Sequence, residues 1–526
     1  MNCKIEPWQI VFYVLVAAVL LIAHIRLSAY AFDDAFIHFR IASNQLDFGA
    51  PYFNPGDPLK VSSSSGWVIL LTGLLAATRW IGFGSSFPFI VSIFNALALF
   101  MGMWVFVWII ENLAERQLTF SERLFFQVQY LGVLFLSSWG LMETGLALLG
   151  AGWGILLLLR AKPAGIEVLA LAVSIRLELI VLLGLVFVCL LIQRKFNPIH
   201  ILGYAMLGMA PFMIYDFYYY GTMIPQSMIA KPMVYAITPV ISFFDILLYS
   251  LPDRLIANVP ALLLLGLALL SYALTNSLIG LRQRATPSGA WILVFSFWGL
   301  VIMVGYMVAH SLIFDWYRPL YMIPLIVAGS ICFFAPVRPK PRAKILAYLV
   351  MASCAVLAGR TLLAGVIGPG FLNREFEAGS RVRSYQRVGS ILHKYFPDAS
   401  LLTSEIGGLG YSFKGEILDA VGLGSPEAML FHPLAVPAQR SGGYVGAIPP
   451  NYVRATMPEL IVSLDTFAEA LLKDDVINSY NQINVPAYLP EDAANSFGET
   501  IWGSEFLRIY IRMDLPIPEE IIALAR

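Results

Sequence analysis

The sequence predicts a mostly α-helical, polytopic membrane protein with a C-terminal α/β domain outside the membrane. Hydrophobic residues make up 58% of the 526-residue chain and charged residues only 13%, so the chain is far more apolar than an ordinary soluble domain. Apolar runs long enough to cross a bilayer, which needs about 17 to 25 residues, recur as far as residue 366. Beyond that point charged residues, Gly and Pro become frequent, which indicates a separate soluble domain.

Polar clusters divide residues 1–366 into about eleven expected membrane crossings. The first run is too long and has too little N-terminal charge for a cleaved signal peptide, so we expect it to remain as a helix. The expected crossings are residues 8–30, 87–110, 124–140, 144–160, 164–176, 178–193, 199–217, 256–280, 290–310, 319–336 and 345–366.

The positions of Lys and Arg predict the orientation of these crossings. If the N-terminus is cytoplasmic, most basic residues before position 367 fall in cytoplasmic connections, as the positive-inside rule requires. This places the long first loop, residues 31–86, and the domain 367–526 on the outer face of the cytoplasmic membrane. The 34 basic and 34 acidic residues balance, so nothing indicates a nucleic-acid partner.

The C-terminal region has the mixed pattern of an α/β domain. Apolar residues recur at helical spacing between positions 382 and 395, and a second helix is expected at 466–475. Strand-like segments occupy 400–413 and 416–423, and a late strand is expected at 506–513.

The stretch AFDDAFIHFR, residues 31–40, places two adjacent carboxylates directly after the first apolar run. If a helix continues from there, Asp34 and His38 share one face, and Asp33 and Arg40 share another. One carboxylate would then be held by an internal partner, while the other stays free to act. The alternative is that the two aspartates simply cap a short interfacial helix, where acidic groups favour the positive end of the helix dipole.

The first loop resembles that of a known enzyme superfamily. FDDAFIHFRIASNQLDFGAPYFNPGDPLKVSSSSGW is similar to the first outer loop of the glycosyltransferase C superfamily, in its arabinofuranosyltransferase-like branch, which reads DDAFISFRYA, then FNPG, then a polar turn before Trp. The similarity continues in GLMETGLALL, SIRLELI, FYYYGTMIPQSMIAKP, FDWYRPLYMIP and TSEIGGLGYSFKGEILDAVGL. The chain departs from the family pattern at Leu177, Gln226 and Glu405, where Pro, Asn and Asp are usual.

The resemblance implies a glycosyltransferase C fold and a definite reaction. Such enzymes take a sugar from a polyprenyl-phosphate carrier in the membrane lipid and transfer it to an acceptor on the outer face of the membrane. An acidic residue in the first outer loop is their main catalytic group. Arabinofuranose is suggested by the branch of the family alone, and the acceptor is an envelope glycan or a surface protein such as a pilin.

The chemistry of such a transfer indicates roles for particular residues. A base must deprotonate the acceptor hydroxyl, and fixed cations must stabilise the leaving phosphate. We assign Asp33 as the base, with Asp34 supporting it; a divalent cation, if one is used, would bind one of these two carboxylates. Lys231 and Arg318, and then Arg176, are expected at the phosphate, unless these cations serve lipid headgroups instead.

Three further residues are expected at the sugar, whether of the donor or of the acceptor: His38, Glu143 and Tyr220.

Other functions remain open at this point. A glycan ligase or polymerase that uses a lipid-diphosphate donor is the nearest alternative. A secondary transporter fits less well, because the sequence shows no internal repeat and its charged outer residues cluster at helix ends rather than at the midplane. A structural membrane subunit is the third alternative.

Overall fold

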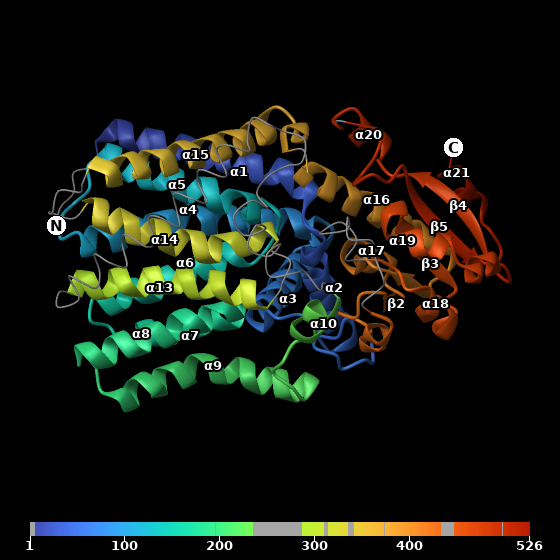
Figure 1. Cartoon of the computed structure of the whole chain (residues 1–526), viewed down its shortest axis with the longest axis horizontal. Coiled ribbons are helices and arrows are strands. Elements are labelled where there is room, and N and C mark those ends of the chain that lie inside the picture. Colours follow the sequence, from blue (N-terminus) through green and yellow to red (C-terminus); the bar gives the residue numbers. More distant parts are fainter. Residues whose placement is uncertain are drawn as a thin grey trace.

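The computed structural model describes residues 6–194, 196–234, 287–309, 314–334, 341–372, 374–432, 447–496 and 498–525. The molecule is elongated, with a bundle of helices at one end and the C-terminal domain at the other (Figure 1). The N-terminus lies at the far end of the bundle, and the C-terminus lies at the edge of the domain (Figure 1).

The bundle is built from apolar helices that agree with the expected runs, except for 256–280, which lies outside the described residues. Within the described residues, six stretches are long and apolar enough to cross a membrane, so the chain has the character of a multi-pass membrane protein. The helices are α1 (Pro7–Leu27), α4 (Phe87–Leu113), α5 (Phe120–Trp139), α6 (Thr144–Leu159), α7 (Ala164–Ile175), α8 (Ile180–Gln193), α9 (Pro198–Tyr220), α13 (Pro287–Val308), α14 (Arg318–Phe334) and α15 (Pro341–Val366).

Glycines allow neighbouring helices of the bundle to approach closely. A Cβ at Gly165 of α7 would collide with the carbonyl oxygen of Gly154 in α6. A Cβ at Gly132 of α5 would likewise collide with the backbone of Cys354 in α15. Small residues at such crossings are typical of helices that associate in lipid, where close packing replaces the hydrophobic effect.

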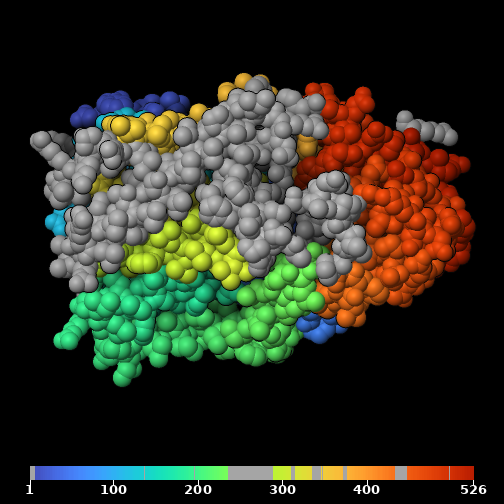
Figure 2. Space-filling model, viewed as in Figure 1, coloured from blue at the N-terminus to red at the C-terminus, as the bar shows by residue number. Residues whose placement is uncertain are grey.

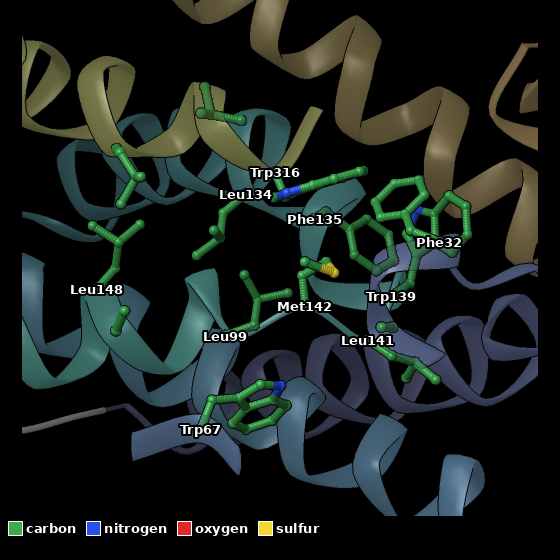
Figure 3. Packing of buried hydrophobic residues seen from close by; sticks show 14 of the residues in the cluster. Phe32, Trp67, Leu99, Leu134, Phe135, Trp139, Leu141, Met142, Leu148 and Trp316 are labelled. Carbon is green, nitrogen blue, oxygen red and sulfur yellow. The ribbon is translucent and has the colours of Figure 1, made fainter. Parts of the chain in front are cut away.

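Large aromatic side chains fill the bundle at the end nearest the domain. Phe32 lies between Trp139 and Trp316, with ring centroids 5.4 Å and 4.9 Å away (Figure 3). Leu99 and Met142 lie in the same cluster (Figure 3). Because Phe32 directly precedes the two aspartates, this packing anchors the start of the first loop against the bundle.

The surface of α9 is largely apolar and exposed. Ile199, Ile214 and Tyr218 expose 77%, 68% and 79% of their surface. In Figure 2 this helix forms part of the lower face of the molecule. An exposed apolar face of this kind indicates contact with lipid or with a partner.

Three helices lie between the bundle and the C-terminal domain (Figure 1). They are α2 (Asp33–Phe48), α3 (Ser65–Trp80) and α10 (Gln226–Val234). The helical continuation predicted after residue 32 is thus confirmed. α2 ends at Gly49, whose φ of 76° suits the left-handed position after a helix.

The C-terminal domain contains one five-stranded sheet in the order β2-β1-β3-β5-β4. β1 pairs in parallel with β2 and β3, whereas β5 runs antiparallel to β3 and β4. The strands are β1 (Ser400–Thr403), β2 (Glu416–Asp419), β3 (Leu460–Leu464), β4 (Tyr480–Pro486) and β5 (Phe506–Arg512). The helices are α16 (Arg374–Tyr395), α17 (Ile406–Phe413), α18 (Pro450–Thr456), α19 (Asp465–Leu472), α20 (Pro490–Ala493) and α21 (Glu519–Ala523).

The predicted elements of this domain are confirmed with two exceptions, both in the strand-like segments. The expected strand 416–423 ends at Asp419, and residues 420–423 form a loop. α16, α19 and β5 coincide with the expected helices and the late strand. The expected strand 400–413 is wrong in its second half, because residues 406–413 form α17. Ile406, Leu409 and Phe413 fall on one face of that helix and are buried. The spacing of apolar residues in this segment is therefore compatible with a helix as well as with a strand.

Candidate active site

A polar cavity lies where α2, the start of α6, α10 and the C-terminal domain meet. The space between its lining atoms is about 430 Å³ when its opening to solvent is counted. The lining residues are Asp34, Ile37, His38, Val61, Ser62, Ser63, Met142, Glu143, Arg176, Ser227, Lys231, Trp316, Tyr317 and Leu423.

Five of the residues singled out in the sequence line this one cavity, although they come from distant parts of the chain. They are Asp34, His38, Glu143, Arg176 and Lys231. Helical spacing explains the first two, since positions i and i+4 share a face of α2. The other three come from separate loops and helices, which local sequence patterns do not bring together.

The two aspartates have different surroundings. Asp33 turns away from the cavity: its two carboxylate oxygens accept hydrogen bonds from the amides of Gly407, at 2.9 Å, and Gly408, at 2.8 Å. Asp34 lines the cavity and has no hydrogen bond or ion pair to any residue in the described part of the chain. The carboxylate that is available for proton transfer is therefore that of Asp34, not Asp33 as we expected from the sequence.

The alternative that the two aspartates cap their own helix is not what the structure shows: Asp33 caps a different helix. α2 begins at Asp33, but no side chain caps its first amides. Asp33 instead satisfies two orphan amides at the start of α17, a helix of the other domain. Burial raises the pKa of Asp33, while Arg381 and these two amides oppose the shift.

A second acidic group lies close to this contact. Glu405, directly before α17, forms an ion pair with Arg381. Burial raises the pKa of Glu405 to about 8, and the nearby Asp33 and Asp34 add to the shift against the effect of Arg381. The boundary between the two domains thus gathers several carboxylates.

The positive charge of Arg176 is largely committed to protein partners. Arg176 forms ion pairs with Glu143 and, at 3.2 Å, with Glu178. Its guanidinium group lies 4.6 Å from the centroid of the Tyr317 ring. Arg176 and Glu143 are almost completely buried, with 3% and 0% exposure, so this pair is held firmly in the cavity wall.

Lys231 is the cavity cation that remains available. Its ammonium group donates a hydrogen bond of 2.9 Å to the Tyr317 hydroxyl and lies 5.1 Å from the centroid of the Phe314 ring. Lys231 makes no ion pair with a carboxylate in the described residues. An ammonium group held by aromatic rings and a hydroxyl is well suited to receive an anion from the cavity.

His38 and Glu143 lie next to each other in the cavity wall without a hydrogen bond between them. His38 Nδ1 lies 3.1 Å from the Ser62 hydroxyl, and its Nε2 lies 3.9 Å from Glu143 Oε2. That distance is too long for a hydrogen bond. Glu143 Oε2 is buried without a hydrogen-bond partner among the described residues.

Besides Asp33, two more of the expected site residues do not line the cavity. Arg318, at the start of α14, forms an ion pair of 2.7 Å with Asp315. The Tyr220 hydroxyl donates to the carbonyl oxygen of Pro51 at 2.6 Å, which fastens the end of α9 to the first loop. Both contacts are structural, so the expected roles at the phosphate and the sugar are not supported by position.

Sequence reasoning did not assign the other nine lining residues to the site, among them Ser227, Trp316, Tyr317 and Leu423. Ser227 lies four residues before Lys231, and Trp316 lies two residues before Arg318. Both belong to stretches that carry the family resemblance, which could have indicated them. Leu423 belongs to the C-terminal domain, and nothing local in the sequence places it against a membrane helix. Among the residues that the structure describes, no group of three or more His, Cys, Asp or Glu side chains is arranged to hold a metal ion.

Comparison with known proteins bears on the C-terminal domain alone. A family described as a domain of unknown function, DUF8728, matches residues 374–502, from the start of α16 to just before β5. No curated protein matches the chain. The cavity itself therefore carries the argument about function.

Proposed function

We propose that this protein is a membrane glycosyltransferase that moves a sugar, arabinofuranose by its family resemblance, from a polyprenyl-phosphate donor to an acceptor hydroxyl. The observation that supports the proposal is the cavity itself. Asp34 and Lys231 line one polar cavity beside a bundle of apolar helices, and neither forms an ion pair with another of the residues that the structure describes. Those are the groups that a proton abstraction coupled to loss of a phosphate requires.

The proposed reaction assigns each group a step. Asp34 takes the proton of the acceptor hydroxyl. At the same time, the oxygen of that hydroxyl forms a bond to the anomeric carbon of the sugar. The bond from that carbon to the phosphate oxygen breaks, and the electron pair leaves with the phosphate. Lys231 and the Tyr317 hydroxyl stabilise the phosphate charge that develops. His38 and Glu143, which also line the cavity, contact the sugar.

The membrane arrangement follows from the same proposal. The chain has about eleven crossings in a glycosyltransferase C fold, with a cytoplasmic N-terminus and the cavity at the outer face of the cytoplasmic membrane. The exposed apolar surface of α9, which precedes α10 and Lys231, provides a path for the isoprenoid tail of the donor. The acceptor is an envelope glycan or a surface protein.

Purified full-length protein provides the test. Turnover of a polyprenyl-monophosphate arabinose is measured in detergent with a membrane-glycan acceptor fraction, for the natural sequence, Asp34→Asn and Asp57→Asn. Asp57 lies exposed on the same loop and serves as the matched control. We expect Asp34→Asn to lower kcat by about 10² to 10⁴-fold, the usual contribution of a general base, and Asp57→Asn to retain activity.

Two results would overturn the proposal. Full activity in Asp34→Asn would remove the general base. Turnover of the matching polyprenyl-diphosphate sugar, with none of the monophosphate, would identify a lipid-diphosphate-dependent ligase instead.

A further inference from the structure

The C-terminal domain contacts the cavity region through a specific pair of helices, α2 and α17. A Cβ at Gly407 would collide with the carbonyl oxygen of Asp33, so a side chain other than glycine would separate the helices at this point. The amides of Gly407 and Gly408 both point at the Asp33 carboxylate. Asp33 therefore binds the amino end of α17, where the helix dipole is positive.

Arg40 makes the complementary contact at the other end of α17. It lies seven residues after Asp33, two turns along the same face of α2. Its guanidinium group is 3% exposed and donates to the carbonyl oxygens of Gly410, of Gly415 at 2.7 Å and of Phe53 at 2.7 Å. A cation near the carboxyl end of a helix complements the negative end of its dipole. One face of α2 thus matches both ends of α17.

An adjoining face of α2 carries the cavity residues. Asp34 is rotated by about 100° from Asp33 around the helix axis, and His38 follows one turn later on the same side as Asp34. Since the Asp33 face is fixed against α17, the rotation of α2 about its own axis is fixed as well. The direction in which Asp34 points is therefore set by the other domain.

The C-terminal domain also supplies a piece of the cavity wall. The carboxylate of Asp419 accepts hydrogen bonds from the amides of Val421, at 2.8 Å, and Leu423, at 2.5 Å, which folds residues 419–425 into a tight loop. The Gln226 side chain donates to the carbonyl oxygen of Gly422 at 3.1 Å, which ties this loop to α10. Leu423 then lines the cavity.

We propose that the C-terminal domain is part of the active site, with Asp33 as the positioning residue through which it holds Asp34 in the cavity. This inference rests on the proposed function for its catalytic consequence. Asp33 itself takes no proton from the acceptor. Its contact with α17 sets the geometry of the base, and a displacement of a catalytic group by about 1 Å can cost about 100-fold in rate.

Two substitutions break the contact from its two sides. Asp33→Asn removes the charge that binds the amides of α17. Gly407→Ala pushes α17 away from α2 and leaves the sequence of α2 unchanged. We expect each to lower kcat by about 10 to 100-fold while the KM for the polyprenyl-phosphate sugar changes less than about twofold. Because both act through one contact, the double variant is expected to be no worse than the more damaged single variant.

Hydrogen exchange of the full-length protein provides a readout that does not depend on activity. The amides of residues 34–41 and 407–410 are expected to exchange faster in Asp33→Asn and in Gly407→Ala than in the natural protein. Gly73→Ala is the matched control, because a Cβ at Gly73 meets nothing within 4 Å. It is expected to leave exchange and kcat unchanged.

The outcomes separate this inference from the proposed function. Unchanged exchange of residues 34–41 in both variants overturns the positioning role, whatever the activity. Wild-type kcat in either variant, alongside an inactive Asp34→Asn, overturns it as well and leaves the proposed function intact. Additive losses in the double variant would show that Asp33 and Gly407 act separately and would also refute the inference.

Discussion

The side chains of Asp33 and Asp34 belong to different parts of the molecule although the residues are neighbours in the chain. Asp33 bonds to the amides of Gly407 and Gly408 in the C-terminal domain, whereas Asp34 lines the cavity between the domain and the bundle. One carboxylate is used for attachment and the other remains free for chemistry. The following predictions test the structure around this division.

Lys231 is expected to bind the donor phosphate. Lys231→Met removes the ammonium group but keeps the apolar stem, so we expect the KM for the polyprenyl-phosphate sugar to rise about 10-fold or more, with partial recovery in Lys231→Arg. Steady-state kinetics with varied donor concentration measure this. Arg318→Met is the comparison, because Arg318 lies outside the cavity lining and pairs with Asp315. An equal rise of KM in Arg318→Met would contradict the assignment.

The ion pair between Glu143 and Arg176 is expected to be important for stability. Both side chains are buried, so Glu143→Gln leaves the guanidinium charge of Arg176 with a weaker set of partners. We expect the free energy of unfolding to fall by about 3 to 5 kcal/mol, as for other buried pairs that lose one member. Thermal unfolding of the purified protein in detergent measures the change.

An exposed pair provides the control for this prediction. Glu469 and Lys473 form an i,i+4 ion pair on the surface of the C-terminal domain, with 39% and 72% of their side chains exposed. Glu469→Gln is expected to cost only about 0.3 to 0.5 kcal/mol. Equal losses in the two variants would show that burial does not strengthen the Glu143 pair.

The buried carboxyl of Asp419 is expected to make stability depend on pH. Burial raises its pKa to about 6, and the amides of Gly424, Val421 and Leu423 oppose the shift. The unfolded chain has a pKa of about 3.9, so the folded state holds this proton more tightly. The contribution of this group is therefore full below about pH 4 and is lost as the pH rises through about 6, by up to about 3 kcal/mol.

Comparison with Asp419→Asn isolates that component. We expect the difference in Tm between the natural protein and Asp419→Asn to change across pH 4 to 7, because the variant does not titrate at this position. Asp398→Asn, at an exposed site in the same domain, is expected to follow the profile of the natural protein. Parallel profiles for Asp419→Asn and the natural protein would refute the prediction.

The contact between α6 and α7 is expected to tolerate only glycine at position 165. A Cβ at Gly165 would meet the carbonyl oxygen of Gly154 and the side chain of Leu158, so Gly165→Ala should lower the free energy of unfolding by about 1 to 3 kcal/mol. Thermal unfolding again provides the measurement. A Cβ at Gly184 of α8 meets nothing within 4 Å, so Gly184→Ala should be neutral or slightly stabilising.

The elements that depend on local pattern could be predicted from the sequence. The apolar runs correspond to helices because burial of the backbone in lipid leaves few alternatives to a helix. The shared face of Asp34 and His38 follows from helical spacing alone. Residues that converge on the cavity from separate loops, such as Glu143 and Lys231, were reached through the order of motifs, since no local rule relates them.

The error at residues 406–413 has a non-local cause. IGGLGYSF holds three glycines in eight residues, which weakens a helix by about 1 kcal/mol for each glycine relative to alanine. Asp33 and Arg40 stabilise α17 through hydrogen bonds at its two ends, which offsets its low helix propensity. The exchange of roles between Asp33 and Asp34 has the same origin, because the partner of Asp33 lies 374 positions away in the chain.

The glycine-rich sequence of α17 also has a consequence for the order of events during synthesis. The chain is made from its N-terminus, so α2 is complete long before residues 406–413 exist. We expect a helix with three glycines to form only when it meets Asp33 and Arg40 on α2. The cavity therefore acquires its final shape only after residues 406–423 have been made and have packed against the first loop and α10.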